Sequence, residues 1–319
     1  MNSNADNENL KLGLVETFLN LEKLDKHLYR STHLMPGLPT SQRVYGGQVI
    51  GQSLVAAGKT VPPEYHVHSL HCYFIKAGDK NVPIVYHIDP VRDGRSFATR
   101  FIKAVQDGEA IFSCQVSFHK EEATSIEHQM PMPVVPKPEE LKDAYVILKE
   151  ACERSDLSED RRRLLKERLR QLPTTFDLRP TDAGAFLRLK TAKPHYFLWV
   201  KSKGPVGDEI RLHHCVAAFI SDSSMVGTAL LPHLAAGFRL GMAVSLDHSM
   251  WFHRYNFNIE DWMLYETEST IAVGCRAFIH GRLWTTDGVL VLSTAQEALI
   301  RAKIPDGSSK SPSATNAAG

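Results

Sequence analysis

The chain has 319 residues, which is enough for one large domain or two domains of ordinary size. Hydrophobic residues make up 43% of the chain and charged residues 23%, a composition that excludes wholesale disorder. The chain has 37 Lys and Arg residues and 36 Asp and Glu residues, so its net charge is only +1. We therefore expect no nucleic-acid partner.

No targeting or membrane signal is readable in the sequence. Residues 1–9 are polar and acidic, unlike a secretory signal, and no apolar run approaches the ~18 residues of a membrane span. The five cysteines are far apart and form no C-x-x-C pair, a pattern that favours free thiols in a reducing compartment. We therefore expect an intracellular protein without a membrane span.

A first block, residues 10–119, combines one apolar helix with a run of strands. From Gly47 to Thr60 the helical pattern has no polar stripe, which predicts a helix buried on every side. Further on, Ser96–Val105 and Ala110–Phe118 are rich in β-branched and aromatic residues and flank Asp107-Gly108. Such a turn between two strand patterns predicts a β-hairpin.

A middle segment, residues 120–175, resembles a linker that contains helices. Two helical patterns, about Glu139–Arg154 and Ser158–Leu172, follow a proline-rich stretch. The second pattern is strongly basic, which leaves open an anionic partner, although a solvated helix face is favoured. The basic residues are Arg161, Arg162, Arg163, Lys166, Arg168 and Arg170, and the leucines spaced for a buried face are Leu164, Leu165, Leu169 and Leu172.

A second block, residues 176–303, repeats the plan of the first. A second apolar helix is predicted over about Arg211–Met225, and a second hairpin flanks Asp287-Gly288, which lies 180 residues after the first turn. A further echo, offset by 176 residues, matches Ser69-Leu70 with Ser245-Leu246, each expected to open a strand.

One buried helix inside a curved antiparallel sheet, repeated twice, is the double-hotdog arrangement, and this α+β architecture is our predicted fold. Its two sheets are expected to join edge to edge. The remaining tail, residues 304–319, has no apolar periodicity and is predicted to be disordered.

Four stretches carry a resemblance to a known family. They are Arg43–Gln52 (RVYGGQVIGQ), His66–Phe74 (HVHSLHCYF), Ser245–His253 (SLDHSMWFH) and Asp287–Glu297 (DGVLVLSTAQE). Together they resemble the acyl-CoA thioesterase II family, which includes bacterial and animal peroxisomal double-hotdog enzymes, over about residues 10–303.

The resemblance implies a catalytic trio in the second block. The family's Asp, hydroxyl and Gln fall on Asp222, Ser245 and Gln296. These residue types fit thioester hydrolysis, which needs a base for water, groups that orient the water, and dipoles for the carbonyl oxygen. Asp222 would be the base if burial in an apolar helix raises its pKa, and backbone amides would stabilise the oxyanion.

Each residue of the trio also has a plainer interpretation. Asp222 alone would mark a helix end with a solvent-facing carboxylate, and Ser245 and Gln296 would be ordinary strand residues. A triad of Ser245 with Asp247 and His248 is rejected, because neighbours on a strand point to opposite faces. His248 and His253 could each line the site, although a structural histidine is the favoured role for both.

The first block is expected to lack the trio, so that each chain carries one site. The counterparts of Ser245 and Gln296 by sequence offset are Ser69 and Val116, and His71 stands where the second block has Asp247. The first block would then be the non-catalytic half, which supplies a wall of the acyl tunnel.

No cofactor or metal site is expected. The sequence has no P-loop, no G-x-G-x-x-G motif and no G-x-S-x-G elbow, which disfavours nucleotide cofactors and an α/β-hydrolase. His66, His68 and His71 form a possible metal cluster, but no Cys or carboxylate accompanies them, and metal binding is disfavoured.

The function implied is hydrolysis of fatty acyl-CoA to free acid and coenzyme A, within fatty acid metabolism. The resemblance extends this to medium and long chains, dicarboxyl and bile-acid esters, and to a peroxisomal location, although the chain ends Ala-Ala-Gly rather than Ser-Lys-Leu and the cytosol stays open. Exposed sheet edges favour a homo-oligomer. The alternatives are a noncatalytic acyl-CoA-binding or partner-docking hotdog protein and, less favoured, a hydratase.

Overall fold

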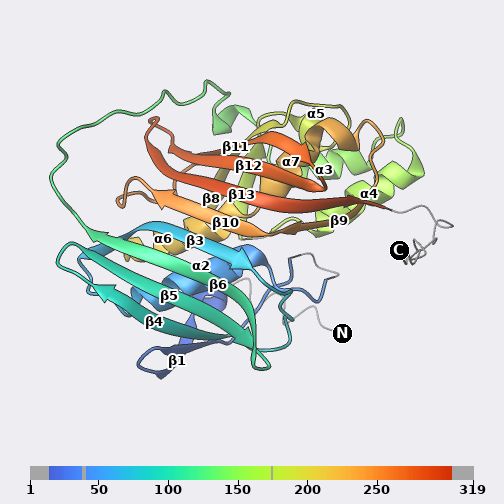
Figure 1. Ribbon diagram of the computed structural model, residues 1–319. Helices are drawn as coiled ribbons and strands as arrows, with labels where there is room; N and C mark the ends of the chain where they lie inside the picture. The colour runs from blue at the N-terminus through green and yellow to red at the C-terminus, as the bar shows by residue number, and fades with distance from the viewer. Residues whose placement is uncertain (1–13, 38–40, 174, 304–319) are drawn as a thin grey trace, which may run out of the picture.

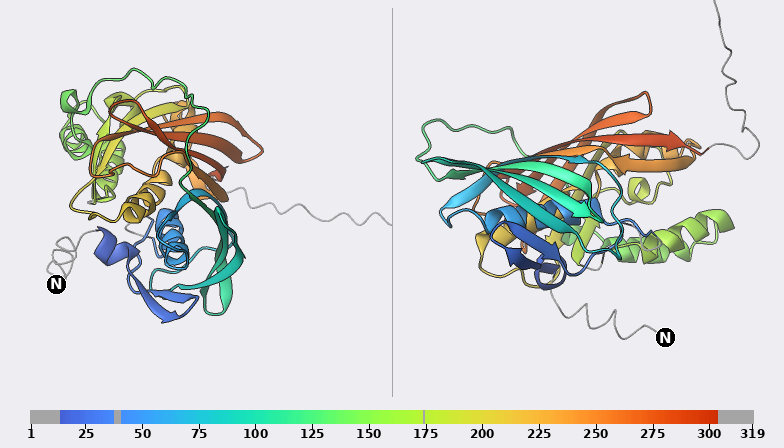
Figure 2. Two further views of the ribbon diagram at one scale, coloured as in Figure 1. Left: turned by 90° about the vertical axis from the view of Figure 1, so that its left-hand side faces the viewer. Right: turned by 60° about the horizontal axis from the view of Figure 1, so that its bottom comes forward.

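In the computed structural model, residues 14–37, 41–173 and 175–303 can be described, so the predicted tail at 304–319 lies outside the described part. The strands form one antiparallel sheet of thirteen strands in the order β1-β2-β4-β5-β6-β3-β10-β13-β12-β11-β8-β7, with β9 paired to β13 (Figure 1). The sheet curves around two central helices, which Figure 2 shows from two further sides.

The elements of the chain up to the middle segment form the first half of this sheet. After a π-helical turn, Val15–Leu19, they are β1 (Leu21–Asp25), β2 (Leu28–Ser31), α2 (Gly46–Gly58), β3 (Tyr65–Phe74), β4 (Val85–Asp93), β5 (Phe97–Gln106) and β6 (Glu109–Lys120). As the apolar pattern predicted, α2 is buried along almost its whole length, from Gly47 to Ala57.

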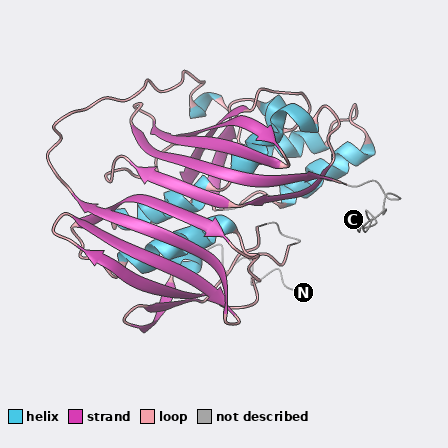
Figure 3. Cartoon of the chain, in the orientation of Figure 1, coloured by secondary structure: helices cyan, strands magenta, loops and turns pink. Residues whose placement is uncertain are grey.

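The middle segment holds helices, and the second half of the sheet follows it (Figure 3). The middle elements are a 3-10 turn (Pro138–Glu140), α3 (Ala144–Cys152) and α4 (Glu159–Arg170). The later elements are β7 (Phe176–Pro180), α5 (Ala183–Phe186), β8 (His195–Ser202), α6 (Ile210–Ser221), α7 (Met225–Leu234), β9 (Leu240–Ser245), β10 (Asp247–Phe252), β11 (Met263–Val273), β12 (Arg276–Thr285) and β13 (Leu290–Ala302).

Two contacts join the halves of the molecule. Strands β3 and β10 pair antiparallel, for example Leu70 with Met250, so the two sheets meet edge to edge as predicted. Beneath this seam α2 and α6 run antiparallel. Gly47 lies against Phe219, and Gly51, one turn later in α2, lies against Cys215, which is one turn earlier in α6. A Cβ on Gly47 would lie 2.3 Å from the Phe219 carbonyl oxygen, so glycine permits this close approach.

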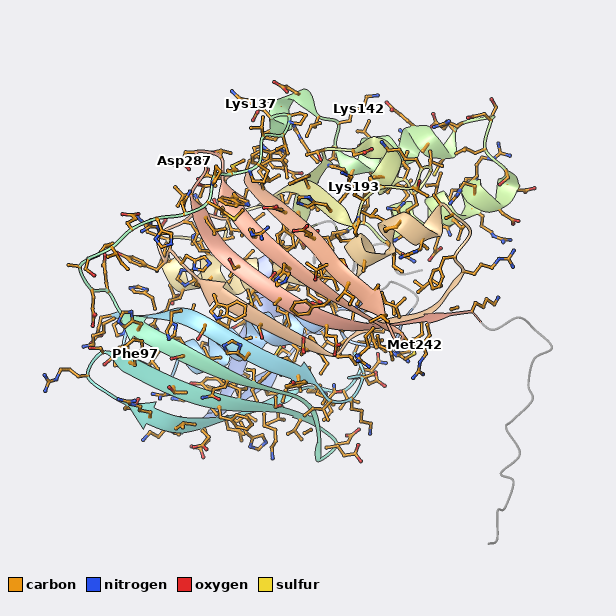
Figure 4. All side chains as sticks on the ribbon, turned by 45° about the horizontal axis from the view of Figure 1, so that its top comes forward. Phe97, Lys137, Lys142, Lys193, Met242 and Asp287 are labelled. Carbon is orange, nitrogen blue, oxygen red and sulfur yellow. The ribbon has the colours of Figure 1, made fainter. Side chains whose placement is uncertain are left out.

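The middle segment packs on the second half in two ways. Helices α3 and α4 form a small core of their own with the residues after α5, in which Leu148 and Leu165 are almost fully buried. The chain before these helices crosses the outer face of the sheet, where Trp199 donates to the Pro136 carbonyl oxygen at 2.9 Å. Figure 4 shows Lys137 and Lys142 on this stretch. The prediction for Leu164 was wrong: it is 57% exposed, because Leu165 occupies the inward position.

Both predicted hairpins form, with different turns. Asp107 and Gly108 have φ of 48° and 80°, the left-handed pair that a two-residue turn requires. At the second hairpin Gly288 alone has positive φ, 87°, and Thr285 pairs with Val289 across a longer loop that carries Asp287 at its tip (Figure 4).

Two predicted boundaries were wrong. The second central helix ends at Ser221 rather than about Met225, with Asp222 as its C-cap, and α7 then starts at Met225. Ser245 ends β9 rather than opening a strand, and Ser69 lies in the middle of β3. Backbone pairing continues past Ser245, since the Leu246 N–H donates to the Glu297 carbonyl oxygen at 2.9 Å before β10 begins at Asp247.

One helical stretch, Ile210–Leu234, is long and apolar enough by composition to cross a membrane. It consists of α6 and α7 with the break between them, and 61% of its most apolar window is buried inside the fold. Burial of this kind is typical of a core helix.

The contact between the two central helices predicts a sharp difference between two glycines of α2. Gly51→Ala should lower the free energy of unfolding by about 1–3 kcal/mol, because its Cβ would lie 2.9 Å from Leu19 and 3.1 Å from the Cys215 carbonyl oxygen. Gly58→Ala meets no atom within 4 Å and should be neutral or stabilising by up to ~1 kcal/mol. Urea denaturation of both variants checks this, and equal effects would contradict the packing described.

Candidate active site

Asp222 lies where the two halves of the molecule meet. As the C-cap of α6, it is carried by the antiparallel helix packing to the beginning of α2. Its carboxylate accepts a hydrogen bond from the backbone N–H of Gly47, and a Cβ on Gly46 would come within 2.8 Å of Oδ2. The plainer interpretation was therefore partly wrong: Asp222 does mark a helix end, but its carboxylate faces the other half of the protein rather than solvent.

Two tyrosines hold the last turn of α6 in place. Tyr45, which precedes α2, donates to the Phe219 carbonyl oxygen at 3.0 Å, and Tyr265 of β11 donates to that of Ser221 at 2.5 Å. They satisfy carbonyl groups that a helix end leaves without internal partners. The position of Asp222 is thus fixed from both halves of the molecule.

Ser245 and Gln296 approach this carboxylate from β9 and β13. Ser245 Oγ donates to Asp222 Oδ1 at 3.2 Å, and Gln296 Nε2 donates to Ser245 Oγ at 2.8 Å. The structure therefore brings all three predicted residues into one chain of hydrogen bonds. Gln296 is fully buried.

His248, fully buried, extends this series of hydrogen bonds behind Gln296. Its Nδ1 lies 2.6 Å from Gln296 Oε1, and its Nε2 lies 2.9 Å from Ser221 Oγ. Because the Gln296 amide nitrogen donates to Ser245, its oxygen accepts from Nδ1–H, which leaves Nε2 of a neutral ring as an acceptor. The Ser221 hydroxyl then shares its one hydrogen between Nε2 and the Ala218 carbonyl oxygen, which lies 2.8 Å away. The alternation along β10, where residues 248, 250 and 252 are buried, is the signal that could have placed His248 inside.

Burial shifts the pKa of Asp222 and of His248, the titratable groups at the two ends of this series of hydrogen bonds. It raises the pKa of Asp222 to about 6, although hydrogen bonds from Ser245, the Gly47 N–H and Gln296 oppose the rise. It lowers the pKa of His248 to about 4, so the imidazole is neutral at physiological pH. A neutral imidazole is consistent with the donor and acceptor pattern above.

The beginning of α2 offers hydrogen-bond donors beside the carboxylate. The N-cap, Tyr45, makes no side-chain cap hydrogen bond, and the first helical residues are Gly46 and Gly47. A helix N-terminus carries a partial positive charge and backbone N–H groups without helical partners. An oxygen that gains negative charge could be stabilised here, beside the Gly47 N–H that already donates to Asp222.

The equivalent positions of the first half differ from those assigned by sequence. Ser245 pairs with Ala298, and 180 residues earlier Phe118 pairs with Val67, so the structural counterpart of Ser245 is Val67 rather than Ser69. A bulge in β3 next to Val67 hides this register from a sequence offset. The C-cap of α2, in the place of Asp222, is Lys59.

A cavity of about 380 Å³ lies near this second, unequipped position, at the beginning of α6. Glu260 lines the cavity and accepts hydrogen bonds from the backbone N–H groups of Val206 and Gly207. None of Asp222, Ser245 and Gln296 lines the cavity. The candidate catalytic groups lie at the opposite end of the helix pair, where α6 ends and α2 begins.

The other polar candidates are engaged elsewhere. Asp247 accepts from the Glu297 backbone N–H at 2.8 Å, and His253 pairs with Ser293. Of the proposed histidine cluster, His68 contacts Ser117 and His71 contacts Ser249. Within residues 14–37, 41–173 and 175–303, no group of three or more His, Cys, Asp or Glu side chains is arranged to hold a metal ion. All five cysteines are free thiols.

Comparisons with known proteins match both halves of the chain to thioesterases. Residues 34–119 match the family model "Acyl-CoA thioesterase N-terminal domain", and residues 187–299 match "Acyl-CoA thioesterase". The chain is 46% identical to acyl-coenzyme A thioesterase 8 of Rattus norvegicus, over 92% of this chain and 91% of the relative.

Solved structures give the same result for the fold. Acyl-CoA thioesterase II TesB2 from Mycobacterium marinum is 36% identical, with a TM-score of 0.72 over 91% of this chain and 98% of that one. A hot dog fold protein of Alicyclobacillus acidocaldarius, 17% identical, has a TM-score of 0.67 over 90% of this chain and 97% of that one. The predicted α+β hotdog architecture is thereby confirmed.

The raised pKa of Asp222 predicts a cost in stability. An aspartate ionises near pH 3.9 in the unfolded chain and near pH 6 in the folded one, so the free energy of unfolding should fall by about 3 kcal/mol as pH rises through this window. Asp222→Asn should therefore melt at or above the wild type at pH 7.5, and this advantage should vanish below pH 4. Thermal melts at both pH values test it. An equal deficit of the variant at both would show that the ionised carboxylate is not destabilising.

Proposed function

The chain belongs to the acyl-CoA thioesterase II family, and from this premise we propose that it hydrolyses medium- to long-chain fatty acyl-CoA by direct attack of a water molecule that Asp222 activates. That the chain is an acyl-CoA thioesterase, a thioester hydrolase, follows from the family. The assignment of residues to steps is our proposal. The single observation that supports it best is the hydrogen-bonded chain of Asp222, Ser245 and Gln296 beside the beginning of α2.

Asp222 would act as the general base. A pKa of about 6 leaves it ionised at neutral pH yet basic enough to take a proton from an attacking water. The Ser245 hydroxyl and the Gln296 amide lie within one hydrogen bond of each other and of the base, which suits them to hold that water.

The carbonyl oxygen of the thioester would lie at the beginning of α2. The Gly46 N–H is oriented there by the helix, and a preorganised donor of this kind stabilises the charge that develops on the oxygen. The neighbouring Gly47 N–H already donates to Asp222 and so holds the base in place. The side of this site formed by α2 comes from the first half of the chain, so both halves are needed for one site.

The reaction balances with water as the only co-reactant. The water oxygen forms a bond to the carbonyl carbon while its proton passes to Asp222, and the C–S bond then breaks. The departing sulfur takes the proton from Asp222, which leaves free coenzyme A, the fatty acid and the ionised base.

The noncatalytic alternative has less support. A binding or docking protein would need no perturbed carboxylate, whereas burial holds Asp222 in a state that the fold does not favour at neutral pH. In such a protein, a neutral residue in place of Asp222 at the end of α6 would make the fold more stable at neutral pH.

Three further properties are proposed from the resemblance to animal thioesterase 8. Breadth toward dicarboxyl and bile-acid esters and a peroxisomal location rest on that resemblance. Hotdog thioesterases are typically oligomeric, and a homo-oligomer is supported here by the exposed edge strand β1 at one end of the sheet. Acyl-CoA is the proposed partner molecule.

Removing each member of the trio should lower turnover by different amounts. We expect Asp222→Asn to lose ~10² or more in kcat for decanoyl-CoA, and Ser245→Ala and Gln296→Ala ~10-fold or more, because the base acts on the proton and the others only orient the water. Thiol release measured with matched melting curves tests this. Ser249→Ala, on the outer face beside His71, is the control that should stay active. Full activity of Asp222→Asn would exclude it as the base.

His248 should act as a positioning residue for Gln296. His248→Asn places an amide donor near the position of Nδ1 and should keep most activity, whereas His248→Leu frees the Gln296 amide to turn and should lower kcat with little change in KM. Combining His248→Leu with Gln296→Ala should add little to the loss. If the two losses simply add, or if KM changes instead of kcat, His248 has only a packing role.

A further inference from the structure

A cluster of arginines gathers where α4, α5 and β8 meet. Arg161 and Arg168 come from α4 and Arg188 follows α5, and all three act electrostatically on each other or on Tyr196 of β8. Among the described residues of α4, ion pairs are formed by Arg163 with Asp160 and by Arg170 with Glu167. The three arginines of the cluster have no such carboxylate partner in the part of the chain that is described.

Arg168 is the least satisfied of the three. Its guanidinium lies over the Phe186 ring, 4.9 Å from the centroid, and its Nη1 is buried without a hydrogen bond. Burial, followed by the charges of Arg188 and Arg161, lowers the pKa of Arg168 to about 10. A buried guanidinium nitrogen that lacks a hydrogen-bond partner is costly and calls for an explanation.

Arg188 lies directly after the end of α5. Its φ of 58° is the left-handed conformation in which helices often end. The backbone N–H groups of Arg188 and Leu189 donate to the carbonyl oxygens of Ala185 and Gly184, each at 3.0 Å. The end of α5 thus fixes the backbone that carries the second guanidinium of the cluster.

A nearby carboxylate is already engaged. Asp182 caps α5 by accepting from the Ala185 backbone N–H at 3.0 Å, and it forms an ion pair with Lys190 at 2.7 Å. It acts on Tyr196, but it is not among the groups that shift the pKa of Arg168 or Arg188. The cluster therefore keeps its positive charge.

Tyr196, beside the cluster, lies on the same face of the sheet as Gln296 and close to the same row of paired residues across the strands. The row of residues through Gln296 crosses the sheet by way of Ile279 and Ser269 and reaches Pro194, two residues before Tyr196. Three strand spacings separate the ends of this row, or about 14 Å. Tyr196 pairs with Thr267, whose hydroxyl contacts Thr228 on the helix side of the sheet.

We propose that Arg168 and Arg188, with Arg161 at the rim, bind the phosphate groups of the coenzyme A moiety, an inference that rests on the proposed function. The extended pantetheine arm separates the thioester from these phosphates by a span comparable to the row just described. Guanidinium groups bind phosphate oxygens with paired hydrogen bonds, which would satisfy Arg168 Nη1. The basic residues of α4 then divide into a solvated face and a ligand-binding face.

The test compares two variants that each change one arginine of the cluster with a control variant that changes an arginine outside it. Arg168→Lys keeps the charge and stem but loses the paired geometry, and Arg188→Gly removes a guanidinium while relieving the positive φ, so it should fold. Arg163→Gln on the exposed side of α4 is the control. Each protein is measured with decanoyl-CoA, decanoyl-3′-dephospho-CoA and decanoyl-pantetheine, and for direct binding of free coenzyme A.

Both variants should raise KM for decanoyl-CoA and Kd for coenzyme A by about 10- to 100-fold at unchanged kcat, with no effect on decanoyl-pantetheine. Arg163→Gln should match the wild type. Inorganic phosphate should compete with coenzyme A only at far higher concentration if the nucleotide is the ligand. The proposal is overturned if the variants bind coenzyme A normally, or if KM for all three substrates rises equally. Arginine-dependent coenzyme A binding by a protein that hydrolyses no thioester would refute the proposed function and leave this inference standing.

Discussion

The close packing of α2 against α6 is the constraint on which the rest of the molecule depends. Gly47 and Gly51 allow the helices to touch, and their antiparallel direction carries the end of α6 to the beginning of α2. A carboxylate from one half thereby meets helix-end amides from the other, at the level of the seam between β3 and β10. A single half, with only one of these groups, could not assemble the site.

This arrangement sets stability against chemistry. Burial makes the ionised form of Asp222 unfavourable, and the helix end, Ser245 and Gln296 recover only part of that cost. What remains is a carboxylate that is basic enough to attract a proton from water near neutral pH. In the first half, Lys59 and Val67 occupy the matching positions, where neither a base nor a hydroxyl is present.

The sequence alone was sufficient for the architecture because its signals are local. The unbroken apolar pattern of α2 and the turn at Asp107-Gly108 depend on neighbours in the chain. The surroundings of Asp222 were not predictable in this way, since its partners Gly47 and Gln296 lie far away in sequence. The link from His248 to Gln296 and Ser221 was hidden for the same reason, since it joins residues that lie 48 and 27 positions away in the chain.

The most direct test of the central claim is the pH dependence of kcat/KM for decanoyl-CoA between pH 4.5 and 8, measured for the wild type and Asp222→Asn. If Asp222 is the base, kcat/KM of the wild type should rise about tenfold per pH unit below its pKa near 6 and then level off. The residual activity of the variant should lack this step. A flat wild-type profile, or a step near pH 6 that survives in the variant, would contradict the role of Asp222.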